Sequence, residues 1–518
     1  MIKNFKWVVL VSLTFMACTK DDTTTTGEAP VTAGTADFSK YVAIGDSFAA
    51  GYSDGALFKK GQENSYPNLL AQQFAAAGGG VFTTPFMAAD NVGGFSAGGV
   101  QVVSQRLYLE SSSGTPTPTL VPGVSANTLT ERLTGTFNNL GIPGAKSFHL
   151  LFNGYAPLNP YFKRIASSTT ATVLGDALSQ NPTFFSLWIG GNDELGYATN
   201  GGVPTSQDAV NGNDLTPTAT FTNAYNTLVS QLAANGRKGV VANLPYVTAL
   251  PYFKTVPHNP LSNSVLGSGN AVVGLATINA LNTQLYGPLK AALSAVGGSG
   301  RIELLSTTTS NPLLIKDESL PDLSVQLTAA FSSTLGQTNA AIYGAVFGQA
   351  RQAKPTDLVL LPTQGAIGAA PTASDSGLLN PVTLLPIAPS APLNKFGITF
   401  PLQDKHILIP SEIDEIRLAT NAYNTVIQAA ATANNLAFVD AKSVMDQLST
   451  TGIDFNSYNM TSTYVTGGAF SLDGVHPSAR GYALITNLFI DAINAKYGST
   501  LKKKDGRDYQ ILFPKVIN

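Results

Sequence analysis

Five short apolar runs recur along the chain. Each is rich in β-branched or aromatic residues, and they cover residues 41–44, 137–140, 183–189, 238–244 and 436–439. A compact run that is apolar at successive positions is typical of a strand that is covered on both faces, as strands of parallel sheets are. We therefore predict a buried strand at each of these five places.

Helical patterns separate the predicted strands. They cover residues 68–77, 219–234, 411–433 and 478–496. The first pattern follows Ser65-Tyr66-Pro67, which provides a cap residue and an early proline, and the third carries Asp414 and Glu415 in its first turn. Both features favour the start of a helix. Strands that alternate with helices predict an α/β fold with a parallel, doubly wound sheet.

Two stretches interrupt this alternation, at residues 78–136 and 245–405. Both are rich in Gly, Pro, Ser, Thr and Leu and contain no internal repeat. We interpret them as insertions of ordered, apolar loops into one domain at residues 38–500, followed by a C-terminal tail at 501–518. Such loops either shape a substrate pocket or decorate the domain without a role in function.

The composition is apolar and weakly charged. Hydrophobic residues make up 44% of the 518-residue chain and charged residues 12%, with 30 basic and 32 acidic side chains for a net charge of −2. This balance offers no electrostatic footprint for nucleic acid, so we expect no nucleic-acid partner. One cysteine and four histidines exclude an intrachain disulfide and argue against a zinc site.

The amino terminus has the pattern of an export signal. Lys3 and Lys6 precede an apolar run at residues 7–16 that is too short to span a bilayer, and Ala17 then precedes the only cysteine, Cys18. A buried apolar thiol is the alternative for Cys18, but its neighbours are poorly suited to a core. Residues 18–37 are rich in Thr, Asp, Gly, Ala and Pro and predict a flexible tether.

This segment resembles the lipobox of bacterial lipoproteins, in which the signal peptide, here residues 1–17, is removed and the cysteine, here Cys18, is acylated. Thr19-Lys20-Asp21-Asp22 also resembles the export signal of surface lipoproteins in Bacteroidetes-type bacteria. The resemblance implies a lipid anchor in a membrane. It also implies a location in the cell envelope, as an outer-membrane lipoprotein that faces either the cell surface or the periplasm.

Residues suited to nucleophilic catalysis lie at two places far apart in the chain. Gly45-Asp46-Ser47 closes the first predicted strand, where ligands of open α/β sheets bind, although the tripeptide alone is also an ordinary turn. In Asp473-Gly474-Val475-His476, the carboxylate can hold the imidazole Nδ1 and leave Nε2 free to accept a proton. We therefore predict Ser47 as nucleophile, His476 as base and Asp473 as the group that orients the base. The other histidines lack such a neighbourhood and are interpreted as structural: His149, His258 and His406.

Two more predicted strands end in residues that can donate hydrogen bonds. Asn192, in Trp188-Ile189-Gly190-Gly191-Asn192-Asp193, carries an amide that can stabilise an oxyanion by about 3 kcal/mol, although a plain turn is equally permitted. Gly144 ends the segment that begins at Asn139, and its bare backbone N–H can approach a ligand closely.

In this order, the four segments resemble the conserved blocks of the SGNH (GDSL-type) hydrolase superfamily, namely Gly-Asp-Ser, a glycine block, Gly-x-Asn-Asp and Asp-x-x-His. The resemblance implies a flavodoxin-like, three-layer α/β/α sandwich around a five-stranded parallel sheet. It also implies an oxyanion hole made by the backbone N–H groups of Ser47 and Gly144 and the side chain of Asn192. Phe48 departs from the leucine that is common after the serine.

These observations predict a hydrolase of carboxylic esters, lipase-like, that forms an acyl-enzyme on Ser47 and needs no metal or organic cofactor. Its partner would be an ester substrate, either an acyl ester or an acetylated glycan. Two alternatives stay open. One is an O-acetyl esterase acting on polysaccharide, and the other is a non-catalytic surface lipoprotein that binds a glycan or a protein partner.

Overall fold

The computed structural model describes residues 30–112, 114, 116–205 and 212–517. The predicted signal peptide at 1–17, Cys18 and the first part of the predicted tether lie outside these residues. Within the described ranges, no helix combines the length and apolar character needed to cross a membrane.

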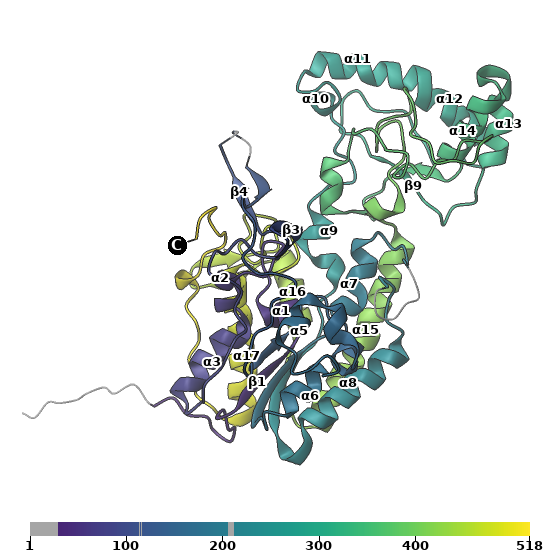
Figure 1. Ribbon diagram of the computed structural model, residues 1–518. Coiled ribbons are helices and arrows are strands. Elements are labelled where there is room, and N and C mark those ends of the chain that lie inside the picture. Colours follow the sequence, from purple (N-terminus) through teal and green to yellow (C-terminus); the bar gives the residue numbers. More distant parts are fainter. Residues whose placement is uncertain (1–29, 113, 115, 206–211, 518) are drawn as a thin grey trace, which may run out of the picture.

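An all-parallel sheet of five strands forms the centre of the α/β fold (Figure 1), in the order β13-β8-β7-β1-β6. The sequence prediction of five buried strands is confirmed. The strands are β1 (Tyr41–Gly45), β6 (Asn139–Gly141), β7 (Phe184–Trp188), β8 (Lys238–Ala242) and β13 (Ala437–Val439).

The register of the sheet aligns the carboxyl ends of three strands. Gly45 of β1 pairs with Trp188 of β7 on one side and with Gly141 of β6 on the other. A Cβ atom on Gly45 would lie 2.4 Å from the Trp188 carbonyl oxygen and 2.9 Å from the Ala49 Cβ, so only glycine permits this approach. The loops that follow β1, β6 and β7 therefore begin side by side.

The four predicted helices are also confirmed, as α3 (Tyr66–Ala76), α8 (Thr218–Leu232), α15 (Pro410–Ala433) and α17 (Ala479–Tyr497). Helix α17 contacts α3, and α15 contacts α8; Figure 1 shows the first pair to the left of the sheet and the second pair to its right. Among the described residues 30–244 and 410–517, the chain forms seven further α-helices: α1 (Ser47–Ala50), α2 (Lys59–Glu63), α4 (Tyr155–Leu158), α5 (Pro160–Ile165), α6 (Val173–Leu178), α7 (Asn192–Thr199) and α16 (Ala441–Thr450).

Residues 78–136 contain two antiparallel strand pairs in place of plain loops. They are β2 (Phe95–Ala97) with β3 (Val100–Val103) and β4 (Leu107–Glu110) with β5 (Thr117–Leu120). The side chain of Arg106 is buried between them and the carboxy-terminal segment, where it donates to the carbonyls of Pro514 and Lys515. The described part of the predicted tail is thus fixed against the body of the protein.

Residues 245–405 differ most from the expectation of loops, because they fold into a helical module. We use this name for residues 256–409, which enclose a hydrophobic core of their own that includes Ile278, Leu289, Leu314 and Phe347. Figure 1 shows the module above and to the right of the sheet. Helix α9 (Pro251–Lys254) precedes it, and its helices are α10 (Asn263–Leu266), α11 (Ala271–Leu281), α12 (Gly287–Ala295), α13 (Ser324–Leu335) and α14 (Gln337–Phe347).

Short antiparallel strand pairs complete the structure: β9 (Leu314–Lys316) with β10 (Ala350–Gln352), β11 (Leu358–Val359) with β12 (Ile407–Leu408), and β14 (Ile453–Phe455) with β15 (Tyr458–Met460). Part of the predicted tether also packs on the fold. The Thr35 N–H donates to the Tyr497 carbonyl over 2.8 Å, and the Thr500 N–H donates to the Thr32 carbonyl over 3.0 Å.

Candidate active site

The structure brings together three residues that the sequence places at its two ends. The Nε2 atom of His476 lies 2.9 Å from the Oγ of Ser47, and Nδ1 of the same ring lies 2.8 Å from the Oδ2 of Asp473. Both distances are those of hydrogen bonds. All three are largely buried, since Ser47 is 6% exposed and the side chains of His476 and Asp473 are 12% and 14% exposed. Serine, imidazole and carboxylate therefore form one continuous chain of hydrogen bonds.

The turn that presents Ser47 follows from its two neighbours. Gly45 ends β1 in close contact with β7, and Asp46 caps α1 by accepting a hydrogen bond from the Phe48 N–H over 3.0 Å. Ser47 is consequently the first residue of α1, a position whose backbone N–H has no partner within the helix.

Asp473 is ionised in the folded protein. Burial opposes its ionisation, but the charge and hydrogen bonds of His476 and the Val475 N–H outweigh burial and lower the pKa of Asp473 to about 2. Its Oδ1 accepts from the backbone N–H of His476 over 2.8 Å and of Val475 over 2.9 Å. A carboxylate held in this way accepts from the Nδ1–H of His476, and the Nε2 atom is then free to accept a proton from Ser47.

A second loop supports Asp473, which sequence reasoning missed. Gly55 donates its N–H to the Oδ2 of Asp473 over 2.8 Å, and Ser471 donates its Oγ–H to the Oδ1 over 3.1 Å. Ser471 in turn accepts from the Asp54 N–H over 2.9 Å, and the hydroxyl of Ser53 donates to a carbonyl of the His476 loop. Ser471 and Asp473 belong to the same loop, but the contacts of Ser53, Asp54 and Gly55 join segments more than 400 residues apart, so no sequence pattern indicates them.

The loops after β6 and β7 are tied to each other at the predicted oxyanion hole. The side-chain Nδ2 of Asn192 donates to the Ala145 carbonyl over 3.0 Å, which places the amide beside Gly144. Gly144 is exposed, and its φ of +79° lies in the left-handed region that favours glycine. Asp193 accepts from the N–H and the hydroxyl of Ser147 over 2.8 and 2.7 Å; burial raises its pKa to about 6 despite these bonds.

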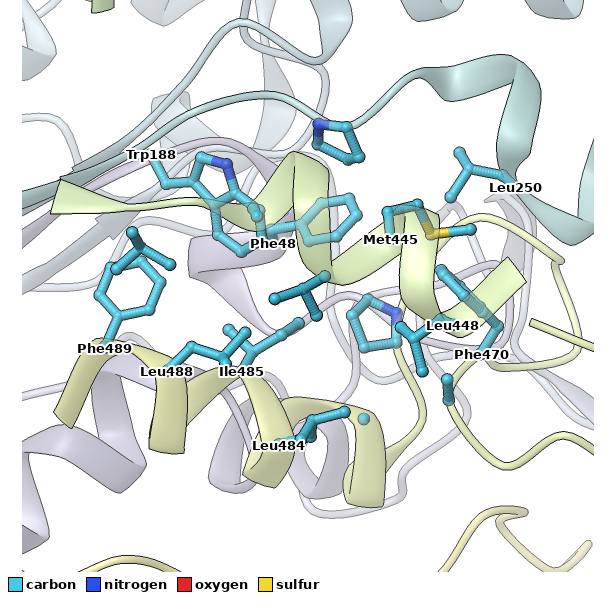
Figure 2. Close-up of a pocket in the computed structure, with 17 residues that line it drawn as sticks. Phe48, Trp188, Leu250, Met445, Leu448, Phe470, Leu484, Ile485, Leu488 and Phe489 are labelled. Carbon is cyan, nitrogen blue, oxygen red and sulfur yellow. The ribbon is translucent and has the colours of Figure 1, made fainter. Parts of the chain in front are cut away.

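Two aromatic rings lie close to the imidazole. The ring centre of Phe48 lies 5.5 Å from that of His476 and 5.1 Å from that of Trp188, and the ring centre of Tyr52 lies 4.6 Å from that of His476. Phe48 and Trp188 also line an apolar cavity, which is drawn in Figure 2. The site therefore combines a polar, hydrogen-bonded set of side chains with apolar walls.

The remaining histidines lie in other parts of the structure. His149 and His406 each accept a backbone N–H through Nδ1, from Lys146 over 3.0 Å and from Gln403 over 3.1 Å, and burial lowers the pKa of His406 to about 4. Among residues 30–112, 114, 116–205 and 212–517, no group of three or more His, Cys, Asp or Glu side chains is arranged to hold a metal ion.

Comparisons with known proteins give no match: no protein-family model, no curated protein and no solved structure is similar to this chain at the level searched. Function is therefore inferred from the geometry of the site and from the chemistry of its residues.

Proposed function

We propose that this protein is a serine hydrolase of carboxylic esters, of the SGNH type, with the three-layer α/β/α arrangement of that superfamily. The observation that carries the proposal is the hydrogen-bonded chain from the Ser47 Oγ through His476 to Asp473, with distances of 2.9 and 2.8 Å. Serine becomes nucleophilic when a positioned base accepts its proton, and this chain supplies both the base and its orienting carboxylate.

The reaction proceeds by two acyl transfers. His476 takes the proton of Ser47 as the Oγ attacks the ester carbonyl, and the imidazolium formed is stabilised by the Asp473 carboxylate. His476 then returns the proton to the leaving alcohol, which leaves an acyl group on Ser47. Water, deprotonated by His476, attacks this acyl-enzyme, and the acid departs as Ser47 regains its proton.

The oxyanion of each tetrahedral intermediate is held by the backbone N–H groups of Ser47 and Gly144 and by the Asn192 amide. A side-chain amide has two N–H bonds, and one of those on Asn192 is already directed to the Ala145 carbonyl. The other N–H is the donor to the oxyanion. A fixed donor of this kind contributes about 3 kcal/mol, because it stabilises charge that develops only in the transition state.

The proposed location is the cell envelope, where acylated Cys18 anchors the protein in a membrane and the folded domain meets its ester substrate. The scheme requires no metal or organic cofactor, because proton transfer and charge stabilisation are both supplied by side chains and backbone groups of the chain.

The experiment that tests the proposal is hydrolysis of chromogenic esters by the purified protein and by Ser47→Ala. We expect a loss of at least about 10³-fold in kcat/KM for Ser47→Ala. Ser230→Ala, which removes an exposed hydroxyl on α8, is the matched control and retains activity. A phosphonate ester should also label Ser47 covalently, as detected by mass spectrometry.

Hydrolysis that is unchanged in Ser47→Ala would overturn the proposal. Release of acetate from acetylated glycans, with little activity on other esters, would favour the O-acetyl esterase instead. Glycan or protein binding that is identical in Ser47→Ala, without any hydrolysis, would favour the non-catalytic lipoprotein.

A further inference from the structure

An apolar cavity lies between helices α16 and α17 and the ends of the central strands (Figure 2). Its walls are hydrocarbon and aromatic throughout, and α17 provides one side with Leu484, Ile485, Leu488 and Phe489. Met445 of α16 lies across from them. The centre of a water-sized sphere can move through about 60 Å³ of the cavity. The cavity is therefore large enough to hold ligand atoms and is more than a packing gap.

This cavity continues toward the catalytic residues. A second hollow, with about 40 Å³ open to the centre of a water-sized sphere, is bounded by Asp46, Gly191 and Val475, which are the chain neighbours of Ser47, Asn192 and His476. Four apolar residues line both spaces: Phe48, Trp188, Pro245 and Leu250. The two spaces therefore adjoin each other, and together they extend from the chain neighbours of Ser47 to the inner face of α17.

Phe48 stands where the two spaces meet. Its ring is 5.5 Å from the His476 ring and 5.1 Å from the Trp188 ring, and its backbone follows directly on Ser47. A group that is covalently attached to the Ser47 Oγ would therefore pass beside this ring on its way to the cavity. The side chain at position 48 is consequently placed to select what enters.

We infer that the cavity binds the aliphatic chain of the acyl group, so that the substrates are esters of linear fatty acids; this inference rests on the proposed ester hydrolase function. A sugar ring would lose its hydrogen bonds to water in such a space and find no polar partner. An alkyl chain loses none. The acetyl group of a glycan acetate would reach no further than the hollow bounded by Asp46, Gly191 and Val475.

Chain-length dependence follows from this placement. Each methylene that leaves water for the cavity raises kcat/KM by about fourfold, which is the factor that corresponds to ~0.8 kcal/mol per buried methylene. The rise ends at the chain length that fills the space. The test is therefore a series of p-nitrophenyl esters from acetate to palmitate, which share one leaving group.

Variants identify the cavity as the cause of the rise. Leu488→Phe and Ile485→Phe add volume to its wall at two half-buried positions, and we expect each to lower the decanoate-to-acetate ratio of kcat/KM at least tenfold. Leu418→Phe makes the same change at a position on α15 that is 63% exposed, and it leaves the ratio and the activity unchanged.

Direct binding provides a measurement that does not depend on turnover or on those variants folding. The sequence has two tryptophans, and Trp7 lies in the predicted signal peptide, so the Ser47→Ala protein that begins at Cys18 reports on Trp188 alone. Trp188 lines the cavity. We expect a terminally brominated dodecanoate to quench at least half of its fluorescence, and unbrominated dodecanoate to restore it by competition.

The outcomes separate the two proposals. Ser47-dependent hydrolysis with a flat chain-length profile and no quenching would overturn the acyl-chain inference and leave the ester hydrolase standing. A rise with alcohol length in acetate esters, and none with acyl length, would also overturn it by assigning the cavity to the alcohol. No Ser47-dependent hydrolysis of any ester would overturn the proposed function itself, and the acyl assignment with it.

Discussion

The backbone N–H of Gly55 donates to the Oδ2 of Asp473 over 2.8 Å, although 418 positions separate the two residues. The same oxygen faces the Nδ1 of His476, while the Oδ1 accepts from Ser471 and from two backbone N–H groups. Both carboxylate oxygens are thus held from several directions. The imidazole is therefore oriented before any substrate binds.

Asp473→Asn should lower kcat/KM by about 10²- to 10⁴-fold, because an amide can place its N–H₂ toward Nδ1 and stabilise the tautomer that cannot accept the proton of Ser47. The measurement is ester hydrolysis at neutral pH with matched protein concentrations. Asp491→Asn, a similar change at a carboxylate on α17 that is 52% exposed, is the control. A loss of less than threefold in Asp473→Asn would contradict the assigned role.

Asp473 should also stabilise the fold in a defined pH window. Its pKa falls from an ordinary 3.8 to about 2 on folding, so the unfolded chain binds the proton more readily. The stabilisation is fully present above pH 3.8 and is lost as pH falls toward 2. Urea unfolding of wild type and Asp473→Asn should show their difference in free energy shrinking by about 2 kcal/mol across this range. A constant difference would contradict the pKa assignment.

Asp46 should show the opposite dependence. Burial is the largest cause that raises its pKa from 3.8 to about 7, against the hydrogen bond from Phe48 that lowers it. The folded protein then holds the proton more readily than the unfolded chain, and wild type should lose stability relative to Asp46→Asn as pH rises from 4 to 7. The slope is at most about 1.4 kcal/mol per pH unit. Parallel stability curves for the two proteins would rule out a buried, protonated Asp46.

The central sheet and the three members of the hydrogen-bonded chain, Ser47, His476 and Asp473, could be predicted from the sequence because their signals are local. The strand at 41–45 is buried at all five positions and carries no charged residue, and Gly-Asp-Ser and Asp-x-x-His are each short segments of contiguous residues. The contact of Gly55 with Asp473 joins segments 418 positions apart and leaves no local pattern.

The helical module could not be predicted for a different reason. Its helices are short, and α11 exposes Val272 and Val273 while it buries only Gly274 and Ile278. A helix with apolar residues on both its buried and exposed faces lacks the periodicity that distinguishes helices in sequence. The frequent glycines and prolines of residues 245–405 favoured loops instead.

Asn192→Ala should lower kcat by about 10²- to 10³-fold and change KM little, because its second amide N–H is used only when the oxyanion forms. The variant also removes the hydrogen bond from Asn192 to the Ala145 carbonyl. The circular dichroism spectrum of the variant should therefore match that of wild type, which shows that the fold is kept. Asn223→Ala, at an exposed position on α8, is the control. A rise in KM at constant kcat would instead place Asn192 in ground-state binding.

Arg351 should determine the stability of the helical module and not the chemistry of the site. Its guanidinium donates to both carboxylate oxygens of Asp357, over 2.6 and 2.8 Å, and also to Asp317; the three side chains are at most 6% exposed. Arg351→Leu leaves two buried carboxylates without their cation and should cost about 3–5 kcal/mol, seen by calorimetry as a lower melting temperature of the module. Because Ser47 and His476 lie outside the helical module, hydrolysis of a short ester at 25 °C should persist.

The control is Arg417→Leu, which removes an exposed ion pair with Asp414 and should change the melting temperature little. Equal destabilisation by both variants would contradict a buried network that supports the module.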